Sequence, residues 1–246
     1  MKIRVASHVH SEWSHDGKWP LSKIASYFKK GGWHCVLTSE HDESFNNDRW
    51  QSYREACIEN SSDNFLIVPG IEYSDPQNIV HVLVWGNIPF FGAGRETEEL
   101  LREVKEFQGV AVLAHPSRRQ AWQKYRSQWT PFLSGVEQWN RKVDGVAPSQ
   151  EAISLIKQNP GLLPFVGLDF HRANQLFPLS MALQLNGKLR EDALLDLLRE
   201  KKGRAKLSGV SIDYLSKGAF YKAVNGMEYF RQYLRKIVKG EIKHTE

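Results

Sequence analysis

The stretch Ile3-Arg4-Val5-Ala6-Ser7-His8-Val9-His10 joins a short apolar run to two histidines near the start of the chain. The run Ile3–Ala6 predicts a buried strand that leads into the His8-Val9-His10 triplet. In an extended strand, residues two positions apart point to the same face, so both imidazoles could reach one metal ion. The carboxyl ends of strands carry the chemistry in parallel barrels, and the histidine pair follows the first apolar run directly.

Apolar runs of strand length alternate with segments of helical periodicity up to about residue 170. After the first run, the expected strands are Cys35–Thr38, Phe65–Val68, Val80–Trp85, Val110–Leu113, Gly135–Trp139 and Leu163–Gly167, and the expected helices are Leu21–Lys30, Arg49–Asn60, Glu96–Phe107 and Ser149–Lys157. This alternation predicts parallel strands joined by helical crossovers. About seven such units favour a closed (β/α) barrel over an open sheet. The first strand is followed by no glycine-rich dinucleotide loop, which argues against a Rossmann fold.

The pattern changes after Asp169-Phe170-His171. Amphipathic helices are expected over Glu191–Lys201 and Met227–Lys239, with a loop at Lys201–Arg204. We expect residues 190–246 to form a helical C-terminal portion that completes or caps the barrel. The prediction is one domain over residues 1–246, since barrels of about 250 residues are common single units.

Bulk composition limits the function classes. The 246 residues carry a formal charge of +5, which suits an anionic partner; nucleic acid is compatible with this charge but not indicated by it. Cys35 and Cys57 form no C-x-x-C pair, so neither a zinc ribbon nor a disulfide framework is expected. The chain has no apolar run of about 18 residues and no signal-peptide pattern at its start, so we expect a cytoplasmic protein without a membrane partner. The sequence gives no indication of the oligomeric state.

Metal-type side chains recur where the apolar runs begin or end. They include six of the nine histidines, and the nine candidate ligands are His8, His10, Asp16, His41, Glu72, His81, His115, Asp169 and His171. Each has an ordinary structural explanation by itself; Asp16, for example, could be a turn residue before Gly17. Their joint occurrence at run boundaries instead predicts a cluster of two or three divalent ions. Mixed imidazole and carboxylate ligands without thiolates suit zinc, manganese or iron.

Within this cluster one ligand is still a choice between two residues, and one role depends on a single carboxylate. His15 competes with Asp16 for the same role, and we favour the carboxylate. Holding two cations a few ångströms apart requires a bridging carboxylate, and Glu72 is the candidate for it.

Seven motifs together resemble those of the PHP (polymerase and histidinol phosphatase) family of metal-dependent phosphoesterases. They are His8-x-His10-Ser11, Ser14-His15-Asp16-Gly17, Glu40-His41-Asp42, Pro69-Gly70-Ile71-Glu72, the strand at His81, Ala114-His115-Pro116 and Gly167-Leu168-Asp169-Phe170-His171. The resemblance covers about the first 170 residues. It implies a distorted (β/α)7 barrel with C-terminal helices and a trinuclear metal site at the carboxyl rim of the strands.

The resemblance also implies a ligand set for each ion. One ion would be held by His8, His10, Glu72 and Asp169, a second by Asp16, His41 and His171, and a third by Glu72, His81 and His115. The residues expected to carry catalysis are His8, His10, Glu72, His115, Asp169 and His171. A metal-activated water would attack phosphorus in line, and the substrate would be an anionic phosphorylated small molecule or nucleotide.

Three arginines next to these motifs are candidate substrate-binding residues. Arg118 and Arg119 follow His115-Pro116-Ser117, and Arg172 follows His171; each could hold a phosphate through bidentate hydrogen bonds. Arg118, Trp122, Tyr125 and Trp129 recur at helical spacing, which predicts a helix. We expect its aromatic side to pack on the barrel, with a stacking wall for a nucleotide as the alternative.

The leading hypothesis is therefore a metal-dependent phosphoesterase, a phosphatase or nuclease-like hydrolase. One alternative is an amidohydrolase-type C–N hydrolase, which also uses H-x-H on a first strand but usually has a metal-bridging lysine where this chain has Glu72. The other is a non-catalytic, metal-bound interaction module. Such a module could tolerate lost ligands, and this chain has lost none.

Overall fold

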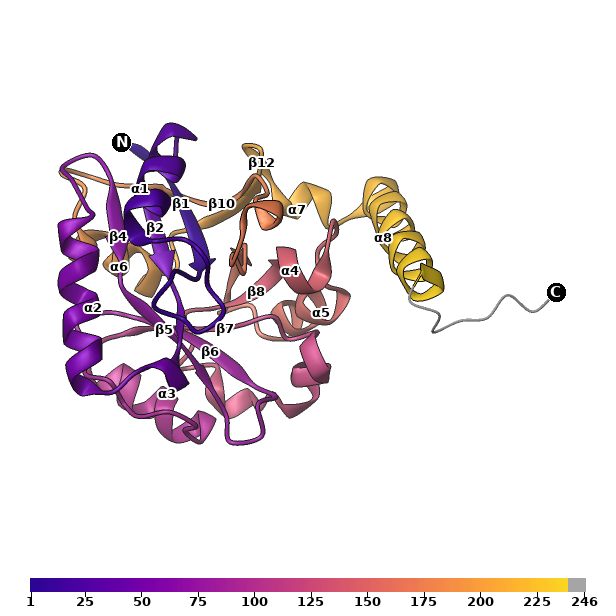
Figure 1. The fold of residues 1–246 in the computed structure, drawn as a ribbon. Coiled ribbons are helices and arrows are strands. Elements are labelled where there is room, and N and C mark those ends of the chain that lie inside the picture. Colours follow the sequence, from indigo (N-terminus) through magenta and orange to yellow (C-terminus); the bar gives the residue numbers. More distant parts are fainter. Residues whose placement is uncertain (239–246) are drawn as a thin grey trace.

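Two six-stranded sheets carry the fold in the computed structural model, which describes residues 1–238 (Figure 1). The first sheet has the order β12-β11-β10-β1-β2-β4 and contains β1 (Lys2–Val9), β2 (Cys35–Thr38), β4 (Leu66–Val68), β10 (Leu179–Gln184), β11 (Arg204–Leu207) and β12 (Val210–Ser211). The second has the order β3-β5-β6-β7-β8-β9 and contains β3 (Glu40–His41), β5 (Gly70–Ser74), β6 (His81–Trp85), β7 (Val110–Leu113), β8 (Gly135–Asn140) and β9 (Leu163–Gly167).

Short connections join the two sheets into a ring of seven strand segments. Ser39 alone separates β2 from β3, and Pro69 alone separates β4 from β5, so each pair is one strand with a break. On the other side, Val9 bridges to Phe170 in parallel, and the Leu168 N–H donates to the Ser7 carbonyl at 3.0 Å. The ring runs through β1, β2/β3, β4/β5, β6, β7, β8 and β9. The α/β fold class expected from the sequence, a distorted (β/α)7 barrel, is confirmed.

One strand runs against the others. The segment between β5 and β6 spans only residues 75–80, which is too short for the crossover that parallel strands require. β6 accordingly pairs antiparallel with both β5 and β7, and the expectation of uniformly parallel strands is wrong at this position. The reversal places the first residue of β6, His81, at the same rim as the last residues of β5 and β7.

Helices follow most of the strands and cover the outside of the ring. They are α1 (Leu21–Lys30), α2 (Asn47–Glu59), α3 (Thr97–Glu106), α4 (Arg141–Asp144), α5 (Gln150–Gln158), α6 (Glu191–Arg199), α7 (Ile212–Leu215) and α8 (Gly218–Val238). α1 forms because Leu21, Ile24 and Phe28 repeat at helical spacing, and all three are buried. α2 begins where the Asn46 side chain accepts a hydrogen bond from the Arg49 N–H.

The core fills the inside of the ring as well as the space between the strands and this helical layer; Trp85 of β6 stacks on Phe165 of β9 inside the ring, with centroids 6.0 Å apart. The largest fully buried side chains of the core include Trp85, Trp139 and Phe165. Buried tryptophan N–H groups need partners, and the Trp85 indole donates to the Thr38 carbonyl at 2.7 Å while that of Trp139 donates to the Gly145 carbonyl at 3.1 Å. The barrel therefore has an extensive apolar core of its own beneath the rim.

The C-terminal portion contains more strand than the sequence predicted. α6 lies within the expected Glu191–Lys201, but β10, β11 and β12 were not expected, and they extend the first sheet antiparallel from β1. α8 begins at Gly218, nine residues before the expected helix, whose last residue, Lys239, lies outside the described residues together with the rest of 239–246. None of the helices within residues 1–238 is long and apolar enough to span a membrane.

The predicted aromatic helix after β7 is not regular. Residues 118–124 and 127–129 form 3-10 turns, and Arg119 and Gln120 have φ values of 47° and 59°, which break a continuous helix. Trp129 is buried, as expected for packing on the barrel, whereas Trp122 is 40 % exposed.

Candidate metal centre

The rim of the ring holds three of the expected ligands in strained backbone conformations. His8, His115 and Asp169 have φ values of 59°, 24° and 49°. Non-glycine residues in this region carry strain of about 1–3 kcal/mol each, which persists where the surrounding structure imposes it and is concentrated at functional sites. At His8 the cause is local, because the pairing of β1 with β2 shifts register between Ser7 and Val9. His8 is the extra residue of this bulge and His10 follows it, so the pair is not on a regular strand, yet the centroids of their rings lie 5.2 Å apart.

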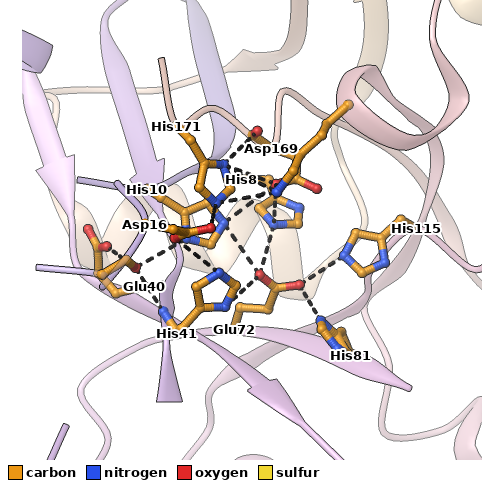
Figure 2. A network of polar contacts seen from close by, with 12 residues as sticks. His8, His10, Asp16, Glu40, His41, Glu72, His81, His115, Asp169 and His171 are labelled. Atoms are coloured by element: carbon orange, nitrogen blue, oxygen red, sulfur yellow. Dashed lines mark hydrogen bonds and ion pairs between the residues drawn. The ribbon is translucent and has the colours of Figure 1, made fainter. Parts of the chain in front are cut away.

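Glu72 lies at the centre of the cluster, surrounded by five imidazoles (Figure 2). One carboxylate oxygen, Oε1, lies 2.6 Å from His81 Nδ1 and 2.9 Å from His115 Nε2. The other, Oε2, lies 3.2 Å from His8 Nε2, 3.3 Å from His10 Nε2 and 3.4 Å from His41 Nδ1. The side chain is 2 % exposed. Its two oxygens face different sets of imidazoles, which is the arrangement that a bridging carboxylate requires.

Asp16 forms the second anionic position. Its Oδ2 lies 2.8 Å from His171 Nε2, and its Oδ1 lies 3.4 Å from His41 Nε2. His15, the rival for this role, lies at the edge of the cluster: its ring is 57 % exposed, pairs with Glu43 at 3.1 Å and has its centroid 5.1 Å from that of His41. Asp16 contacts two imidazoles of the expected ligands, whereas the ion pair of His15 is with a carboxylate outside the cluster.

Asp169 forms the third anionic position and joins the two sides of the cluster. Its Oδ1 lies 3.9 Å from His8 Nε2, 3.7 Å from His10 Nε2 and 3.4 Å from His171 Nδ1. All nine expected ligands thus lie in one connected network (Figure 2).

The donor atoms fit divalent metal ions. Three groups each offer ligand atoms that lie within 4.8 Å of one another: His10, Asp16, His41 and His171; His8, Glu72 and His115; and His8, His10 and Asp169. His10 Nε2, Asp16 Oδ1 and His115 Nδ1 are buried without a hydrogen-bond partner, although such atoms normally have one. Two of these, on His10 and Asp16, belong to one group. A set of imidazoles and carboxylates that leaves buried donor atoms unpaired matches the preferences of zinc, manganese or iron.

The grouping differs in part from the one that the family resemblance implied. Asp16, His41 and His171 are together as expected, with His10 as an additional member. Glu72, His81 and His115 share one contact through Glu72 Oε1. In the expected set of His8, His10, Glu72 and Asp169, each carboxylate lies within 3.9 Å of both imidazoles: Glu72 Oε2 at 3.2 and 3.3 Å and Asp169 Oδ1 at 3.9 and 3.7 Å from His8 Nε2 and His10 Nε2.

The charges of the cluster are strongly coupled. Burial opposes charge on His8, but Glu137, Glu72 and Asp169 outweigh it and hold the pKa of His8 well above its ordinary value. Burial would also raise the pKa of Glu72, yet His8 and His81 keep that pKa well below its ordinary value. Burial together with the neighbouring His171 and His41 lowers the pKa of His10. The carboxylate of Glu72 and the imidazole of His10 are thus shifted toward the forms that bind metal, whereas the raised pKa of His8 means that metal binding there would displace a proton.

A second layer of side chains fixes the ligands in place. Glu137 accepts from the His8 ring at Nδ1, at 2.8 Å, and from the His115 N–H, also at 2.8 Å; Asn140 donates to it at 2.9 Å. Gly167 on β9 must be glycine, because a Cβ there would clash with the Glu137 carboxylate. Partners of this kind fix the tautomer and orientation of ligating histidines.

Glu40 belongs to this layer and not to the cluster itself. Its carboxylate accepts hydrogen bonds from the Ser11 N–H, at 3.0 and 3.1 Å, and from the hydroxyls of Ser11 and Ser14, each at 2.5 Å. Ser14 in turn lies 3.3 Å from His10 Nδ1. Glu40 thus orders the loop after β1 that carries Asp16.

A cavity of about 220 Å³ opens beside the cluster, and the three arginines predicted to bind substrate differ in whether they line it. Arg118 lines it and lies 3.0 Å from His81 Nε2. Arg119 instead donates to the Asn78 carbonyl at 2.9 Å, and Arg172 is exposed on the turn after the last ligand; neither lines the cavity. The aromatic residues of the segment after β7 are also not among its lining residues, which argues against the stacking wall at this cavity.

Lys142 lines the same cavity and was missed at the sequence level. Its Nζ lies 3.1 Å from Asp169 Oδ1 and 3.4 Å from His171 Nε2. It is placed there by Asn140, whose side chain accepts from the Lys142 and Val143 N–H groups and begins α4 directly after β8. The sequence does place Lys142 just after a strand, in the segment Trp139-Asn140-Arg141-Lys142, but a lysine at such a position is too common to indicate a function.

Comparisons with known proteins support this fold. No family model and no curated protein matches the sequence. A two-domain protein from Bacteroides vulgatus that contains a predicted PHP-like metal-dependent phosphoesterase aligns over 84 % of this chain, with a TM-score of 0.62 and 17 % identity; the chain spans 65 % of its length. PsfC from Pseudomonas syringae aligns over 95 % of this chain and 99 % of its own, with a TM-score of 0.63 and 17 % identity.

An amidohydrolase from Chromobacterium violaceum, with bound sulfate and no metal, aligns over 83 % of this chain and 98 % of its own, with a TM-score of 0.50 and 13 % identity. At these identities the comparisons establish the fold alone. This chain has the fold of PHP-like metal-dependent phosphoesterases, as the motif resemblance predicted.

Proposed function

We propose that this protein is a metal-dependent phosphoesterase that hydrolyses a phosphate monoester or a small nucleotide. The observation that carries the proposal is the position of Glu72, with five imidazoles around it, beside a cavity flanked by the cations of Arg118 and Lys142. The fold shared with predicted PHP-like phosphoesterases supports the same conclusion.

Two or three divalent ions would be held by the nine clustered side chains. His10, Asp16, His41 and His171 would hold one, and His8, Glu72 and His115, joined by His81, would hold another; Asp169 would bind beside His8 and His10. Bound ions would lower the pKa of water for attack on phosphorus and offset the charge of the phosphoryl oxygens. Glu137 would keep His8 in the tautomer that presents Nε2 to the cluster.

Arg118 and Lys142 would bind and orient the substrate. They line the cavity from opposite sides of the cluster, since Arg118 contacts His81 while Lys142 contacts Asp169 and His171. A phosphate group between them would receive the planar fork of the guanidinium on one side and the compact ammonium charge on the other. A cavity of about 220 Å³ is large enough for a phosphate group. The two cations that line it favour reaction at a terminal phosphate.

The test is hydrolysis by purified protein loaded with Mn²⁺ or Zn²⁺. The panel contains an aryl phosphate, nucleoside monophosphates, a short oligonucleotide and a cyclic amide, with the Glu72→Gln variant as the inactive control. We expect phosphate release from monoesters and none from the variant. Hydrolysis of the amide alone would support the amidohydrolase alternative. A metal-loaded protein that hydrolyses nothing on the panel would support the interaction module instead.

A further inference from the structure

α8 carries an apolar stripe that is exposed over most of its length within residues 1–238, with only Ile237 at its end half-buried. Its members recur at alternating spacings of three and four residues: Phe220, Ala223, Met227, Phe230, Leu234 and Ile237. Phe220, Met227, Phe230 and Leu234 are between 44 % and 60 % exposed. This spacing is the a/d pattern by which one helix packs along another, and Figure 1 shows α8 at one side of the molecule, away from the two sheets.

A second stripe of α8 is buried and holds the helix on the barrel. Tyr221, Val224 and Glu228 are buried. Glu228 accepts from the Val146 N–H at 3.0 Å, and the Tyr221 hydroxyl donates to the Pro148 carbonyl at 3.3 Å. At 100° per residue the two stripes are centred about 120° apart, so the barrel fixes α8 without covering its apolar side.

We propose that this stripe is the interface of a homodimer, in which α8 packs antiparallel against α8 of a second copy. In antiparallel pairing, a positions meet d positions of the partner helix. A two-fold axis that crosses the stripe at the level of Glu228 and Tyr229 would pair Phe220 with Ile237, Ala223 with Leu234 and Met227 with Phe230. Each layer then joins a larger with a smaller or more flexible side chain, and every stripe residue in the helix has a partner. This is the self-complementarity that a two-fold interface requires.

The residues beside the stripe also suit a second copy. Gly226 and Tyr233 occupy equivalent flanking positions, so in the antiparallel pair the ring of Tyr233 lies over a glycine of the other helix. No charged residue is among the six stripe positions, and like charges are therefore not brought together at the seam.

The exposed area is of the size that a dimer needs. The partly exposed rings of Phe220, Phe230 and Tyr233, with Met227 and Leu234, present on the order of 500 Å² of side chain per copy. Stable interfaces bury about 800 Å² per partner at the standard size, and weak ones less. An apolar patch of this size is often a functional surface. We therefore expect a dimer that dissociates in the micromolar range.

Analytical ultracentrifugation of the full chain tests the dimer. The wild type is expected to sediment as a dimer at tens of micromolar and to dissociate on dilution. Met227→Glu/Phe230→Glu is expected to be a monomer with an unchanged circular dichroism spectrum. Tyr214→Glu is the matched control, since Tyr214 is 79 % exposed on α7, outside the stripe, and this variant should remain dimeric.

A cysteine pair tests the direction of the helices. Phe220→Cys/Ile237→Cys should form an intermolecular disulfide, whereas Phe220→Cys alone should not, because antiparallel copies of position 220 lie about 25 Å apart at 1.5 Å per residue. The native Cys35 and Cys57 are buried and do not compete. A wild type that stays monomeric at high concentration would overturn the proposal. Monomers that bind phosphatidylglycerol vesicles through the stripe would assign it to a lipid surface instead.

Discussion

Glu72→Gln is the substitution that tests the centre most severely, because this carboxylate contacts five imidazoles within 3.4 Å. Glutamine keeps the volume of this buried side chain and removes its charge and one acceptor oxygen. Mutating residues that only support metal ligands typically weakens metal binding by 10–100-fold, so loss of a carboxylate shared between ions should exceed about 100-fold. That factor corresponds to about 2.7 kcal/mol.

Thermal unfolding with and without metal measures this loss. A ligand at about 100 times its dissociation constant stabilises the folded state by about 2.7 kcal/mol. For a chain of this length, each kcal/mol raises the Tm by about 2–4 °C, so Mn²⁺ or Zn²⁺ should raise the Tm of the wild type by about 5–10 °C. Glu72→Gln should lose most of this rise at the same metal concentration, and its turnover should fall with it.

Glu40→Gln is the matched control for this experiment. Glu40 is equally buried and lies on the neighbouring β3, but its acceptor oxygens face Ser11 and Ser14 and contact no imidazole of the cluster. We expect this variant to be less stable without metal and to lose a smaller part of the metal-induced rise in Tm than Glu72→Gln does, because Glu40 only supports the loop that carries Asp16. If Glu72→Gln keeps the rise, or if both variants lose it equally, the assignment of Glu72 as the shared ligand is refuted.

Three further changes give separate tests. His10→Ala should reduce metal binding and abolish turnover with only a modest loss of fold, because the barrel has its own core; global unfolding on circular dichroism would mean that the ions are mainly structural. Lys142→Met should raise KM for a phosphate monoester more than it lowers kcat and leave the metal content unchanged, while Lys142→Arg should partly restore binding; equal kinetics in all three proteins would exclude a substrate contact. Burial raises the pKa of Asp144 to about 7, above its ordinary 3.8, so the folded state holds a proton that the unfolded state releases between these values. Wild-type stability should therefore fall by up to about 1.4 kcal/mol per pH unit as pH rises through this window, and Asp144→Asn should lack that fall; parallel urea-unfolding profiles at pH 5 and pH 7 would contradict it.

The sequence predicted the gathering of the ligands well because eight of the nine lie in a strand or within four residues of its end; Asp16, seven residues after β1, is the exception. β2, β7, β9 and α1 have the predicted bounds, and a parallel arrangement brings strand ends to one rim. The prediction that His81 lies with the other ligands was right, although the prediction of uniformly parallel strands was wrong. The six-residue connection before β6 carried the information, since it can form only a hairpin-like return.

Other features were not predictable because they depend on tertiary pairing. The bulge that turns His8 toward Glu72 depends on the register of β1 with β2, which no local pattern records. β10 to β12 form because β1 offers a free edge, and β10 occupies it antiparallel. Helical spacing after β7 was misleading, because residues Arg119 and Gln120 adopt left-handed conformations that periodicity cannot reveal.

Metal content of the purified protein tests the central claim most directly. Elemental analysis after saturation with Mn²⁺ or Zn²⁺ and removal of free metal should find two or three ions per chain in the wild type, and fewer in His10→Ala. A wild-type protein that retains no ion under saturating supply would contradict the account, as would an ion content that the His10 substitution leaves unchanged.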